Sequence, residues 1–574
     1  MCGIAGIVAK EAGRYLPALD AMNAAQRHRG PDGEGRHAFA ECCLGHVRLS
    51  IIDLAGGAQP LFDTRGTSAI TFNGEIYGYQ ALRQELDYPF RTGSDTEVIL
   101  ALYARYGTHM LPRLPGMFSF AIWDDQRKRL FCARDRFGEK PLFYALGKSG
   151  EFIFASEIKA ILASGLVEPK LNLDGVSHYL AHRHLPANQT IYGTIQALPP
   201  GHSLILENGD LTITPYWSLP TTGEPLDMDT AAQRLEDLIR QAVERQLVAD
   251  VEVGILLSGG LDSSTITAVC SPLKRLRSFS FGFSGSRSEL PYARQVAEHF
   301  GTVHNEITEE VIDVPKMMLA LARIYDEPFA DPSAVPTYQL CRFVSQHLKV
   351  ALSGDGADEL LAGYTYWYRH LLRGDASGPA GGKNTFWSKT AERHWQDLLY
   401  FTPDEIKGMG LPAVRRPRIG QVTDSLDDAL RMDLQGFLPA DILVKTDRAA
   451  MAHGLELRTP FLDVDLAEFL IQLPWQLKMQ GSSDKLLLRK AFENIWPEAI
   501  RKRDKQGFGF DVRNWMQRPD MLALRHHFLG NANRKIYALI PRKTLAACLM
   551  DTGFKGWIML ILSLWLETSP CSIN

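Results

Sequence analysis

Cys2 is the residue of this chain best placed to do covalent chemistry. It directly follows Met1, so removal of Met1 would leave a thiol and a free α-amine on one residue. A free α-amine has a pKa of roughly 8, so it can take the proton of a thiol near neutral pH. A nucleophile and its base then need no second side chain. The alternative is a small buried cysteine at the start of an apolar strand, and Cys2 taken alone favours it.

A glycine-rich segment offers different chemistry. Residues 254–264 read GILLSGGLDSS, an apolar strand, a loop and the start of a helix. Glycines let backbone N–H groups approach an anion, and a helix N-terminus adds donors and a favourable dipole. Asp262 would repel a bare phosphate but suits a Mg²⁺ ion that bridges carboxylate and phosphate. The pattern is not that of a Walker loop, and an ordinary tight turn is the weaker interpretation.

A second loop carries three acids within five residues. Residues 353–359 read SGDGADE and follow a short apolar run. Asp355, Asp358 and Glu359 suit metal and substrate chemistry at the carboxyl end of a strand, where open α/β sheets bind ligands. Taken alone, the segment is equally compatible with a solvated acidic loop.

The elements that would position these residues change character along the chain. Residues 1 to about 210 alternate apolar and polar positions between turn residues, which predicts a β-rich unit. Runs at 117–123 and 129–133 suggest a hairpin. Residues 215–229 are rich in Pro, Thr and Gly and carry little periodicity, which predicts a linker.

Strands and helices alternate after the linker. Apolar runs predict strands at 251–257, 278–283 and 349–352, and helical periodicity predicts helices at 231–243, from Ser263 onward, and at 292–300 with Gly301 as a cap. This alternation predicts a parallel sheet with right-handed crossovers. Beyond about residue 380 the pattern is mostly helical. The longest apolar run, 557–566, is too short to cross a bilayer and predicts a buried helix.

Composition narrows the class of protein. The chain has 574 residues, 45% of them hydrophobic and 22% charged, which predicts a globular protein of two to four domains. Its net charge of -4 gives no sign of a nucleic-acid or membrane partner. The eight cysteines form no CxxC pair, and Cys42 and Cys43 fit a strand core. The sequence after Met1 does not resemble a signal peptide, so we expect a cytoplasmic enzyme.

Together these segments closely resemble the glutamine-hydrolysing asparagine synthetase family over essentially the whole chain. The N-terminal half is similar to a class II glutaminase of the Ntn-hydrolase type, with the motifs CGI at 2–4, RHRGPDG at 27–33, RLSI at 48–51, NGE at 73–75 and GSDTE at 93–97. The C-terminal half resembles a pyrophosphate-loop ATPase, with SGGLDS at 258–263, SGDGADE at 353–359, KTDR at 445–448, ELRTPFLD at 456–463, Lys485 and KQGF at 505–508.

The resemblance implies an α/β protein in two domains. Residues 2–213 would form an αββα glutaminase sandwich, residues 214–229 a linker, and residues 230–574 an ATP-pyrophosphatase domain with a parallel sheet followed by helices. Family members are often homodimers, and they pass ammonia between their two sites through a tunnel.

By this resemblance, the Cys2 thiolate attacks the side-chain amide of glutamine and releases ammonia. The side-chain amide of Asn73 and the N–H of Gly74 would form the oxyanion hole. The residues implied in glutamine binding are Arg48, Leu49, Ile51, Asn73, Gly74, Glu75 and Asp95. Arg48 would clamp the α-carboxylate, and Asp95 with Glu75 would hold the α-ammonium. Alternatively, Asn73-Gly74 is a type I′ hairpin turn, and Arg48 and Asp95 are surface ion-pair residues.

The implied second reaction activates a carboxylate with ATP. The residues placed around ATP are Leu256, Ser258, Gly259, Gly260, Asp262, Ser263, Phe281, Ser353 and Gly354. Asp262 and Asp358 would bind Mg²⁺, and Lys485 would neutralise charge that develops on the phosphate. Asp355 would handle a proton of the incoming ammonia, although some family members carry Glu there. For Lys485, the alternative is a solvated lysine on a helix that begins near Asp484.

The identity of the acceptor carboxylate stays open at this point. The leading hypothesis is aspartate, which gives asparagine, glutamate, AMP and pyrophosphate. The nearest alternative is a pathway-specific amidotransferase that acts on a natural-product or surface-sugar carboxylate, and segments 326–336 and 372–395 would face that acceptor. Intact glutaminase motifs argue against a β-lactam-forming synthetase, and the pyrophosphate loop argues against a phosphoribosyl amidotransferase. A non-catalytic relative would show broken motifs, and none is broken.

Overall fold

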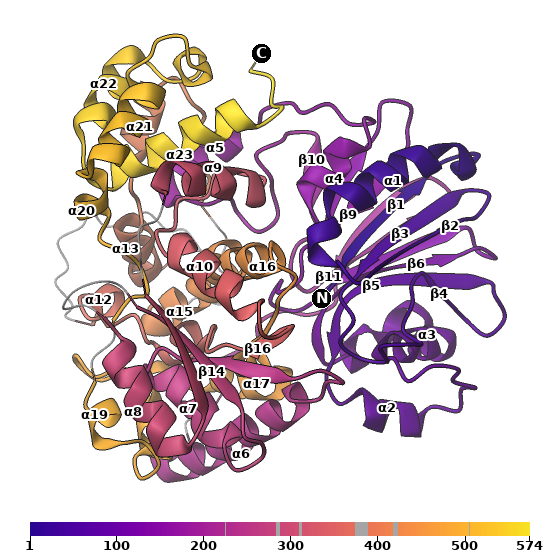
Figure 1. Ribbon diagram of the computed structural model, residues 1–574, viewed down its shortest axis with the longest axis horizontal. Coiled ribbons are helices and arrows are strands. Elements are labelled where there is room, and N and C mark those ends of the chain that lie inside the picture. The colour runs from indigo at the N-terminus through magenta and orange to yellow at the C-terminus, as the bar shows by residue number, and fades with distance from the viewer. Residues whose placement is uncertain are drawn as a thin grey trace.

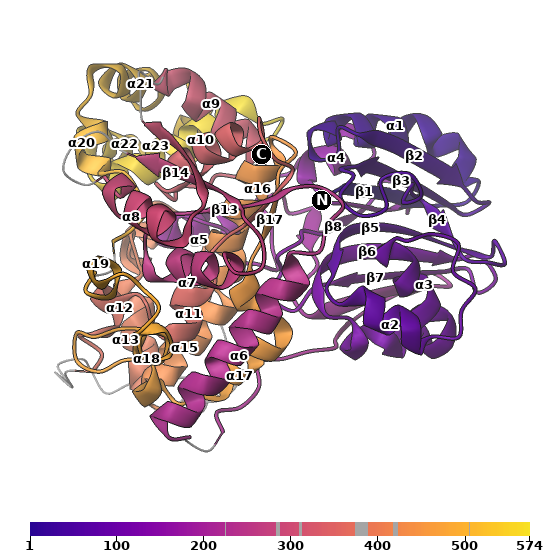
Figure 2. The same cartoon turned by 60° about the horizontal axis from the view of Figure 1, so that its bottom comes forward.

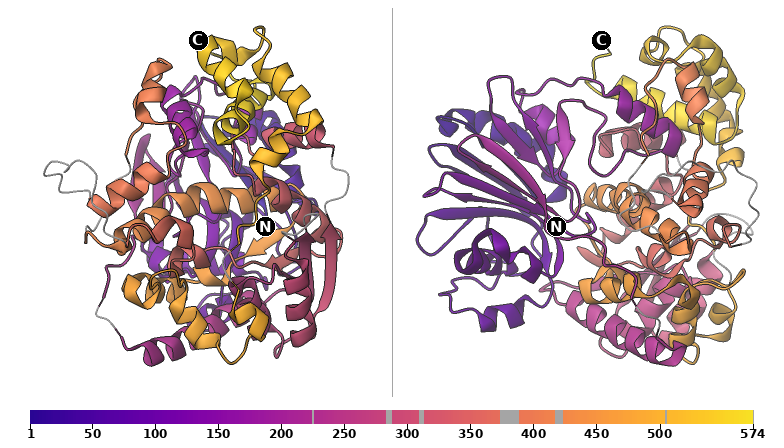
Figure 3. Two further views of the ribbon diagram at one scale, coloured as in Figure 1. Left: turned by 90° about the vertical axis from the view of Figure 1, so that its left-hand side faces the viewer. Right: turned by 180° about the vertical axis from the view of Figure 1, so that it is seen from behind.

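The computed structural model describes residues 1–223, 226–282, 288–308, 313–372, 388–416, 423–503 and 506–573. Phe283, Lys505 and most of the segment 372–395 lie outside these residues. The chain folds into two lobes that lie side by side, an N-terminal lobe drawn in indigo and purple and a C-terminal lobe drawn in magenta to yellow (Figure 1). The N-terminus lies at the boundary between the lobes (Figure 3).

The N-terminal lobe holds two antiparallel sheets. Within residues 1–223, the first sheet has the order β10-β8-β9-β1-β3-β2 and the second the order β12-β11-β7-β6-β5-β4. The strands of the first sheet are β1 (Gly3–Val8), β2 (Gly33–Ala38), β3 (Cys42–Arg48), β8 (Phe143–Leu146), β9 (Phe152–Ala155) and β10 (Ile195–Ala197). Those of the second are β4 (Leu61–Phe62), β5 (Ser68–Ile76), β6 (Gly116–Asp124), β7 (Arg129–Arg134), β11 (His202–Glu207) and β12 (Asp210–Pro215). The predicted hairpin is confirmed as β6 and β7.

Side chains along each strand face the two sides of its sheet in turn, so the two sheets and the helices outside them pack as four layers. Ile4 packs between the sheets with Trp123, while Ala5 packs outward in a cluster that includes residues of α1 (Leu16–Ala25) and α4 (Ile158–Ala163). On the other sheet Phe120 packs outward with residues of α3 (Asp95–Tyr106), which lies beside α2 (Tyr79–Glu85). Successive side chains of a strand face opposite sides, so each sheet is apolar on both faces. Figure 2 shows the resulting αββα order, as expected of an Ntn hydrolase.

The C-terminal lobe is built on a parallel sheet. In its described part the strand order is β15-β14-β13-β16-β17, and every neighbouring pair is parallel. The strands are β13 (Val253–Leu256), β14 (Arg277–Gly282), β15 (Val303–Thr308), β16 (Val350–Leu352) and β17 (Glu456–Arg458). The three predicted strands are therefore confirmed. β15 and β17 were not predicted, because β15 reads VHNEIT at a polar edge and β17 has three residues.

Helices surround this sheet and fill the rest of the lobe. Gly301 caps α8 in the left-handed conformation, as predicted, and α7 begins at Leu261, two residues before its predicted start. Their bounds are α6 (Met228–Gln246), α7 (Leu261–Cys270), α8 (Leu290–Phe300), α9 (Val314–Ile324), α10 (Ala334–Val344), α11 (Ala357–Leu361), α12 (Thr365–Tyr368), α13 (Lys389–Asp397), α14 (Pro403–Gly408), α15 (Leu426–Gln435), α16 (Leu443–Met451), α17 (Val464–Gln472), α18 (Leu486–Phe492), α19 (Glu498–Arg501), α20 (Val512–Met516), α21 (Pro519–Leu529), α22 (Arg542–Met550) and α23 (Phe554–Thr568).

The last helix packs against a helix from the N-terminal part of the chain, which lies among the C-terminal helices (Figure 1). α23 is buried from Gly556 to Leu566, as predicted for its apolar run. It packs against α9 and against α5 (Leu173–His182), and Tyr179 of α5 donates its hydroxyl to the carbonyl of Ile558 at 2.8 Å. In the described residues no single helix is long and apolar enough to span a membrane; α22 and α23 meet the criterion only jointly, with a bend of 119° between them.

Candidate functional site

Cys2 lies buried at the lobe boundary, directly before β1. Its backbone N–H donates to Oδ1 of Asn73 at 2.9 Å, and its carbonyl accepts from Nε of Arg29 at 3.0 Å. Its Sγ lies 4.0 Å from the carbonyl oxygen of Leu49. The α-ammonium of Met1 forms an ion pair with Glu456 of β17 at 2.7 Å. The thiol is thus held at the boundary by contacts with both sheets of one lobe, and an ammonium group is accommodated next to it.

Burial raises the pKa of the Cys2 thiol, and the adjacent α-ammonium opposes that shift. A thiol with a raised pKa is mostly protonated near neutral pH, and the thiolate is the nucleophile. The thiol therefore depends on a base close by. The α-amine that Cys2 would carry after loss of Met1 is such a base.

Asn73 and Gly74 lie inside β5 and do not form a hairpin turn. They pair with Ser119 and Phe118 of β6, so the alternative interpretation as a type I′ turn is wrong. Gly74 has φ +155°, and a Cβ there would lie 2.1 Å from the carbonyl oxygen of Met117. Tertiary strand pairing overrides the local preference of Asn-Gly, and glycine permits the close approach of the neighbouring strand.

The Asn73 side chain is poised to donate. Its Oδ1 accepts from Cys2, while its Nδ2 is buried and has no hydrogen-bond partner among the residues that the structure describes. A buried donor without a partner costs about 1–3 kcal/mol, so a native structure that keeps one has a use for it. An oxyanion that forms beside Cys2 would satisfy this donor.

The remaining residues expected around glutamine surround Cys2 on the same lobe. Leu49 and Ile51 are buried against Met1 in one apolar cluster. Arg48 donates to the carbonyls of Ile52, Asp53 and Leu54 and so holds that loop. Because these are backbone contacts, the structure gives Arg48 no surface ion-pair role in the described residues.

Asp95 and Glu75 are buried acids. Asp95 begins α3 and accepts from the N–H of Ile76 at 3.0 Å, and burial raises its pKa to about 6. The alternative that Asp95 is a surface ion-pair residue is therefore wrong. Burial also raises the pKa of Glu75 well above its ordinary value, while Arg458 of β17, 3.1 Å away, opposes the shift. Arg458 also bonds Glu456 at 2.7 Å, so Glu75 is tied to the parallel sheet.

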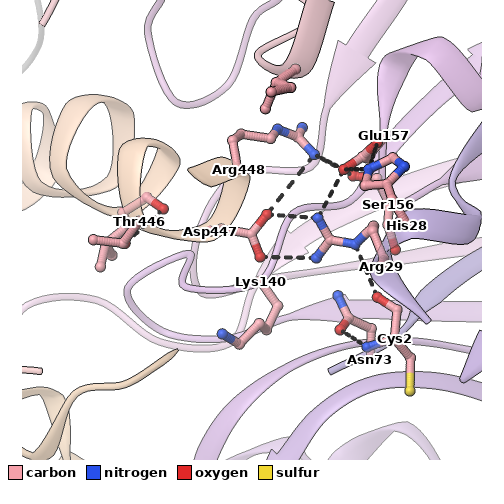
Figure 4. Close-up of polar contacts among 12 residues, drawn as sticks. Cys2, His28, Arg29, Asn73, Lys140, Ser156, Glu157, Thr446, Asp447 and Arg448 are labelled. Carbon is pink, nitrogen blue, oxygen red and sulfur yellow. Dashed lines mark hydrogen bonds and ion pairs between the residues drawn. The ribbon is translucent and has the colours of Figure 1, made fainter. Parts of the chain in front are cut away.

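A buried ionic network crosses the lobe boundary next to Cys2 (Figure 4). Arg29 binds Asp447 of α16 through two bonds of 2.8 and 2.9 Å and binds Glu157 at 3.0 Å. Arg448 binds Glu157 at 3.1 Å. The nearby His28, Lys159 and Arg448 charges hold the pKa of Glu157 well below its ordinary value despite burial. The segment 27–33 thus fixes the lobes against each other and fixes the Cys2 carbonyl.

We expect Arg29→Met to destabilise the protein by about 3–5 kcal/mol, because it leaves Asp447 buried without its bidentate partner. Urea unfolding followed by tryptophan fluorescence measures this. Arg27→Met is the matched control, because Arg27 pairs with Glu34 at an exposed position that is worth about 1 kcal/mol or less. Equal destabilisation by the two variants would contradict a structural role for the network.

The predicted glycine-rich loop connects β13 to α7. The hydroxyls of Ser258 and Ser263 lie 3.1 Å apart, and Gly260 donates its N–H to the Ser258 hydroxyl at 3.2 Å. Gly259 has φ +69°, and a Cβ there would lie 2.6 Å from the backbone of Tyr292. The loop is therefore more than an ordinary turn, because it presents two hydroxyls and a helix N-terminus at one place.

The acidic loop lies beside it and is not a solvated loop. Ser353 donates its N–H to the carbonyl of Arg458 at 2.8 Å and its hydroxyl to Asp355. Glu359 is buried and accepts from Tyr364 at 2.7 Å. A Cβ on Gly354 would lie 2.9 Å from Cβ of Asp262, so the two loops touch.

Lys485 joins the two loops. Its Nζ lies 2.5 and 2.6 Å from the two carboxylate oxygens of Asp262 and 2.6 Å from Asp358. The lysine is 2% exposed, so the interpretation of a solvated lysine is wrong. Two carboxylates that converge on one point also fit Mg²⁺, which prefers oxygen ligands and takes one or two carboxylates together with phosphates.

A cavity of 580 Å³ gathers the residues expected around ATP. Its lining includes Leu256, Ser258, Gly260, Asp262, Ser263, Phe281, Ser353, Gly354, Asp355, Asp358 and Lys485. Gly259 is not in the lining because it packs against α8. The cavity has the size typical of a cofactor site.

Several functional contacts had no signal in the sequence. Arg183 of the N-terminal lobe lines the cavity and pairs with Asp441 at 3.2 Å. Glu456 and Arg458 contact Met1 and Glu75 across the lobe boundary. Glu456 and Arg458 belong to the ELRTPFLD motif, but only the packing of the lobes reveals which residues they contact.

Comparison with known proteins agrees with this geometry. Residues 234–567 match the family model described as asparagine synthase, and residues 1–217 match that of a glutamine amidotransferase domain. The chain is 32% identical to asparagine synthetase [glutamine-hydrolyzing] 1 of Bacillus subtilis, over 98% of this chain and 96% of the relative. It is 29% identical to asparagine synthetase B of Escherichia coli, over 89% and 82%, and 30% identical to asparagine synthetase 3 of Arabidopsis thaliana, over 85% and 74%. The chain therefore belongs to the asparagine synthase family of glutamine-hydrolysing carbon–nitrogen ligases.

Proposed function

We propose that the protein converts L-aspartate to L-asparagine through an aspartyl-adenylate, with ammonia from glutamine and with glutamate, AMP and pyrophosphate as the other products. One observation carries the proposal. A buried cysteine whose N–H bonds Asn73 lies at the lobe boundary, and a cavity with converging carboxylates and a lysine lies in the adjoining lobe. The similarity to named asparagine synthetases supports aspartate as the acceptor.

In the glutaminase half, the α-amine of Cys2 takes the thiol proton, and the thiolate attacks the amide carbon of glutamine. The oxyanion is stabilised by Nδ2 of Asn73 and the N–H of Gly74. Ammonia leaves with the proton, and water then hydrolyses the thioester to glutamate. Arg48 binds the α-carboxylate of glutamine, and Asp95 with Glu75 binds its α-ammonium, while Leu49 and Ile51 line the site.

In the synthetase half, the acceptor carboxylate attacks the α-phosphorus of ATP and pyrophosphate leaves. Ammonia then attacks the acyl carbon, and AMP departs. The loop from Ser258 to Ser263 holds the pyrophosphate, Lys485 neutralises its charge, and Asp355 accepts a proton of ammonia. Asp262 and Asp358 would hold Mg²⁺, which neutralises phosphate charge when bound.

The domain limits, the oligomeric state and the location that we propose are those of the family. We place the glutaminase at 2–213, the linker at 214–229 and the synthetase at 230–574, and we propose a cytoplasmic homodimer. β12 ends at Pro215 and α6 begins at Met228, each within two residues of these limits.

Steady-state AMP release tests the proposed reaction. With glutamine and ATP present, we expect AMP and asparagine to form in equal amounts and only when aspartate is added. A panel of other carboxylates at equal concentration is the control. Absence of aspartate-dependent AMP would reject aspartate as the acceptor.

We expect the KM for glutamine to rise as the pH falls through about 6. The pKa of Asp95 is raised to about 6, so its carboxylate is charged above that pH and neutral below it. Only the charged form attracts an ammonium group, so KM rises about tenfold one unit below the pKa. Asp95→Asn is expected to raise KM at pH 7.5 and to flatten its pH dependence. The control Asp87→Asn, at an exposed position, should match the parent protein, and an unchanged profile in Asp95→Asn would contradict this role.

A further inference from the structure

A second cavity, of 670 Å³, lies between the two lobes. The N-terminal lobe contributes four histidines and Trp217, and the C-terminal lobe contributes Trp395 and Asp433. Arg183, Trp367, Tyr400 and Phe437 line this cavity and also the synthetase cavity, so the two spaces abut at these four residues. Domain interfaces are common places for small-molecule sites.

Three of these histidines, His178, His182 and His184, form a cluster of neutral rings. The ring centres of His178 and His182, one turn apart on α5, lie 4.6 Å from each other, and that of His184 lies 5.8 and 6.2 Å from them. Burial lowers the pKa of His182 to about 3 and that of His184 to about 4, and it lowers the pKa of His178 well below its ordinary value. Each neutral imidazole offers one donor and one acceptor nitrogen.

One nitrogen of the cluster has no partner within the described residues. Nε2 of His182 is buried and has no hydrogen-bond partner in the described part of the chain. A hydroxyl group, which both donates and accepts, is the natural partner of such a nitrogen. A metal ion is a poorer match, because the described residues contain no group of His, Cys, Asp and Glu placed to hold one.

Aromatic rings form further walls of the cavity. The ring centre of Trp395 lies 6.1 Å from that of His182, and Phe437 lies 6.2 Å from His184. Flat apolar walls with a few polar groups between them suit a ring-shaped ligand.

The charge of the lining favours an acid. Four arginines line the cavity, Arg136, Arg183, Arg415 and Arg416, against two aspartates. Arg415 pairs with Asp174 at 3.3 Å and is largely exposed, and Arg416 pairs with Glu392 at 2.6 Å. Exposed ion pairs are worth about 1 kcal/mol or less, so a ligand carboxylate competes for these arginines easily.

We propose that this second cavity binds a small carboxylic acid with a hydroxylated ring. The ring hydroxyls bond the imidazoles of the histidine cluster, the ring lies against Trp395 and Phe437, and the carboxylate pairs with an arginine. Aspartate has no ring, so this site goes beyond the proposed function. The ligand has two sources: it is either an acceptor whose carboxylate faces Arg183 and the synthetase cavity, or an effector whose carboxylate faces Arg415 and Arg416.

Binding to the full chain tests the site directly, without ATP or glutamine. The probe is D-glucuronate, measured by saturation-transfer NMR. D-Glucose, which lacks the carboxylate, and cyclohexanecarboxylate, which lacks the hydroxyls, are the matched probes. We expect saturable glucuronate binding and binding of both matched probes at least about tenfold weaker, since each lacks one set of contacts.

Variants locate the binding. His182→Leu is expected to raise the Kd for glucuronate about tenfold, as the loss of a buried hydrogen bond would. His182→Gln keeps a donor and an acceptor and should retain binding, which separates loss of contact from loss of fold. His526→Leu, at an exposed position on α21, is the control. Absence of saturable glucuronate binding, or equal affinity in the parent and His182→Leu, would overturn the proposal.

AMP release then identifies the source of the ligand. If the ligand is an acceptor, glucuronate itself supports AMP formation with glutamine and ATP. If the ligand is an effector, glucuronate supports no AMP formation and instead changes the rate of the aspartate-dependent reaction. If aspartate supports no AMP at all, the proposed function fails, while the binding result still decides the site.

Discussion

Replacing Cys2 with Ala is expected to abolish glutamine-dependent synthesis and to leave ammonium-dependent synthesis intact. The variant removes the thiol of the residue whose backbone N–H bonds Oδ1 of Asn73, so no thioester forms. Loss of a catalytic nucleophile typically costs on the order of 10³-fold or more in kcat. The synthetase cavity is lined by other residues, so ammonia added as ammonium chloride still reaches an activated carboxylate.

The two nitrogen sources make the experiment decisive. AMP release is measured with glutamine and with ammonium chloride, at equal ATP and aspartate. Cys571→Ala, which removes a buried free thiol near the C-terminus, is the control and should retain both activities. Loss of the ammonium-dependent reaction in a folded Cys2→Ala protein would contradict a two-site enzyme.

The contacts around Cys2 also show why processing of the N-terminus matters. Met1 is 3% exposed and its ammonium group pairs with Glu456. With Met1 removed, the free amine belongs to Cys2 itself, while Arg458 remains as the partner of Glu456 at 2.7 Å. Glu456, which holds the Met1 ammonium, would then be placed to stabilise the ammonium that forms when the Cys2 α-amine takes the thiol proton.

Much of the fold follows from the periodicity of the sequence. The apolar runs at 117–123 and 129–133 predicted a hairpin, and apolar runs before glycine-rich loops predicted parallel strands. The alternative of a turn at Asn73-Gly74 failed because pairing with β6 outweighs a dipeptide preference. β15 and β17 gave no signal, because one is a polar edge strand and the other is very short.

The candidate site could be predicted only in part, because sequence motifs identify residues but not the contacts between them. Motifs named its residues, but their partners lie far away along the chain. Lys485 and Asp262 are 223 positions apart, and Arg29 and Asp447 are 418 apart. Local pattern cannot specify such pairs, because the folding of the whole chain sets the distance between them. The histidine cluster is the opposite case: its members lie within seven residues on and after α5, but its cavity exists only between the packed lobes.

Lys485→Met is expected to lower ATP-dependent synthesis by about 10²–10³-fold with either nitrogen source, the usual cost of losing one group that stabilises transition-state charge. Methionine keeps the length of the side chain but removes its charge, so Asp262 and Asp358 face each other and the phosphates without the ammonium that now lies within 2.6 Å of both. Glutamine hydrolysis should persist within a few-fold, because Cys2 and Asn73 lie on the other lobe.

That split between the two reactions separates catalysis from folding. AMP and pyrophosphate report the synthetase, and glutamate release without aspartate reports the glutaminase. Lys490→Met is the matched control, because Lys490 lies five residues later on α18 and makes exposed ion pairs with Asp229 and Glu493. Lys490→Met should match the parent in both reactions. If Lys485→Met does so as well, the lysine only neutralises two partly buried carboxylates, and the charge on the departing pyrophosphate must be met by other groups in the cavity.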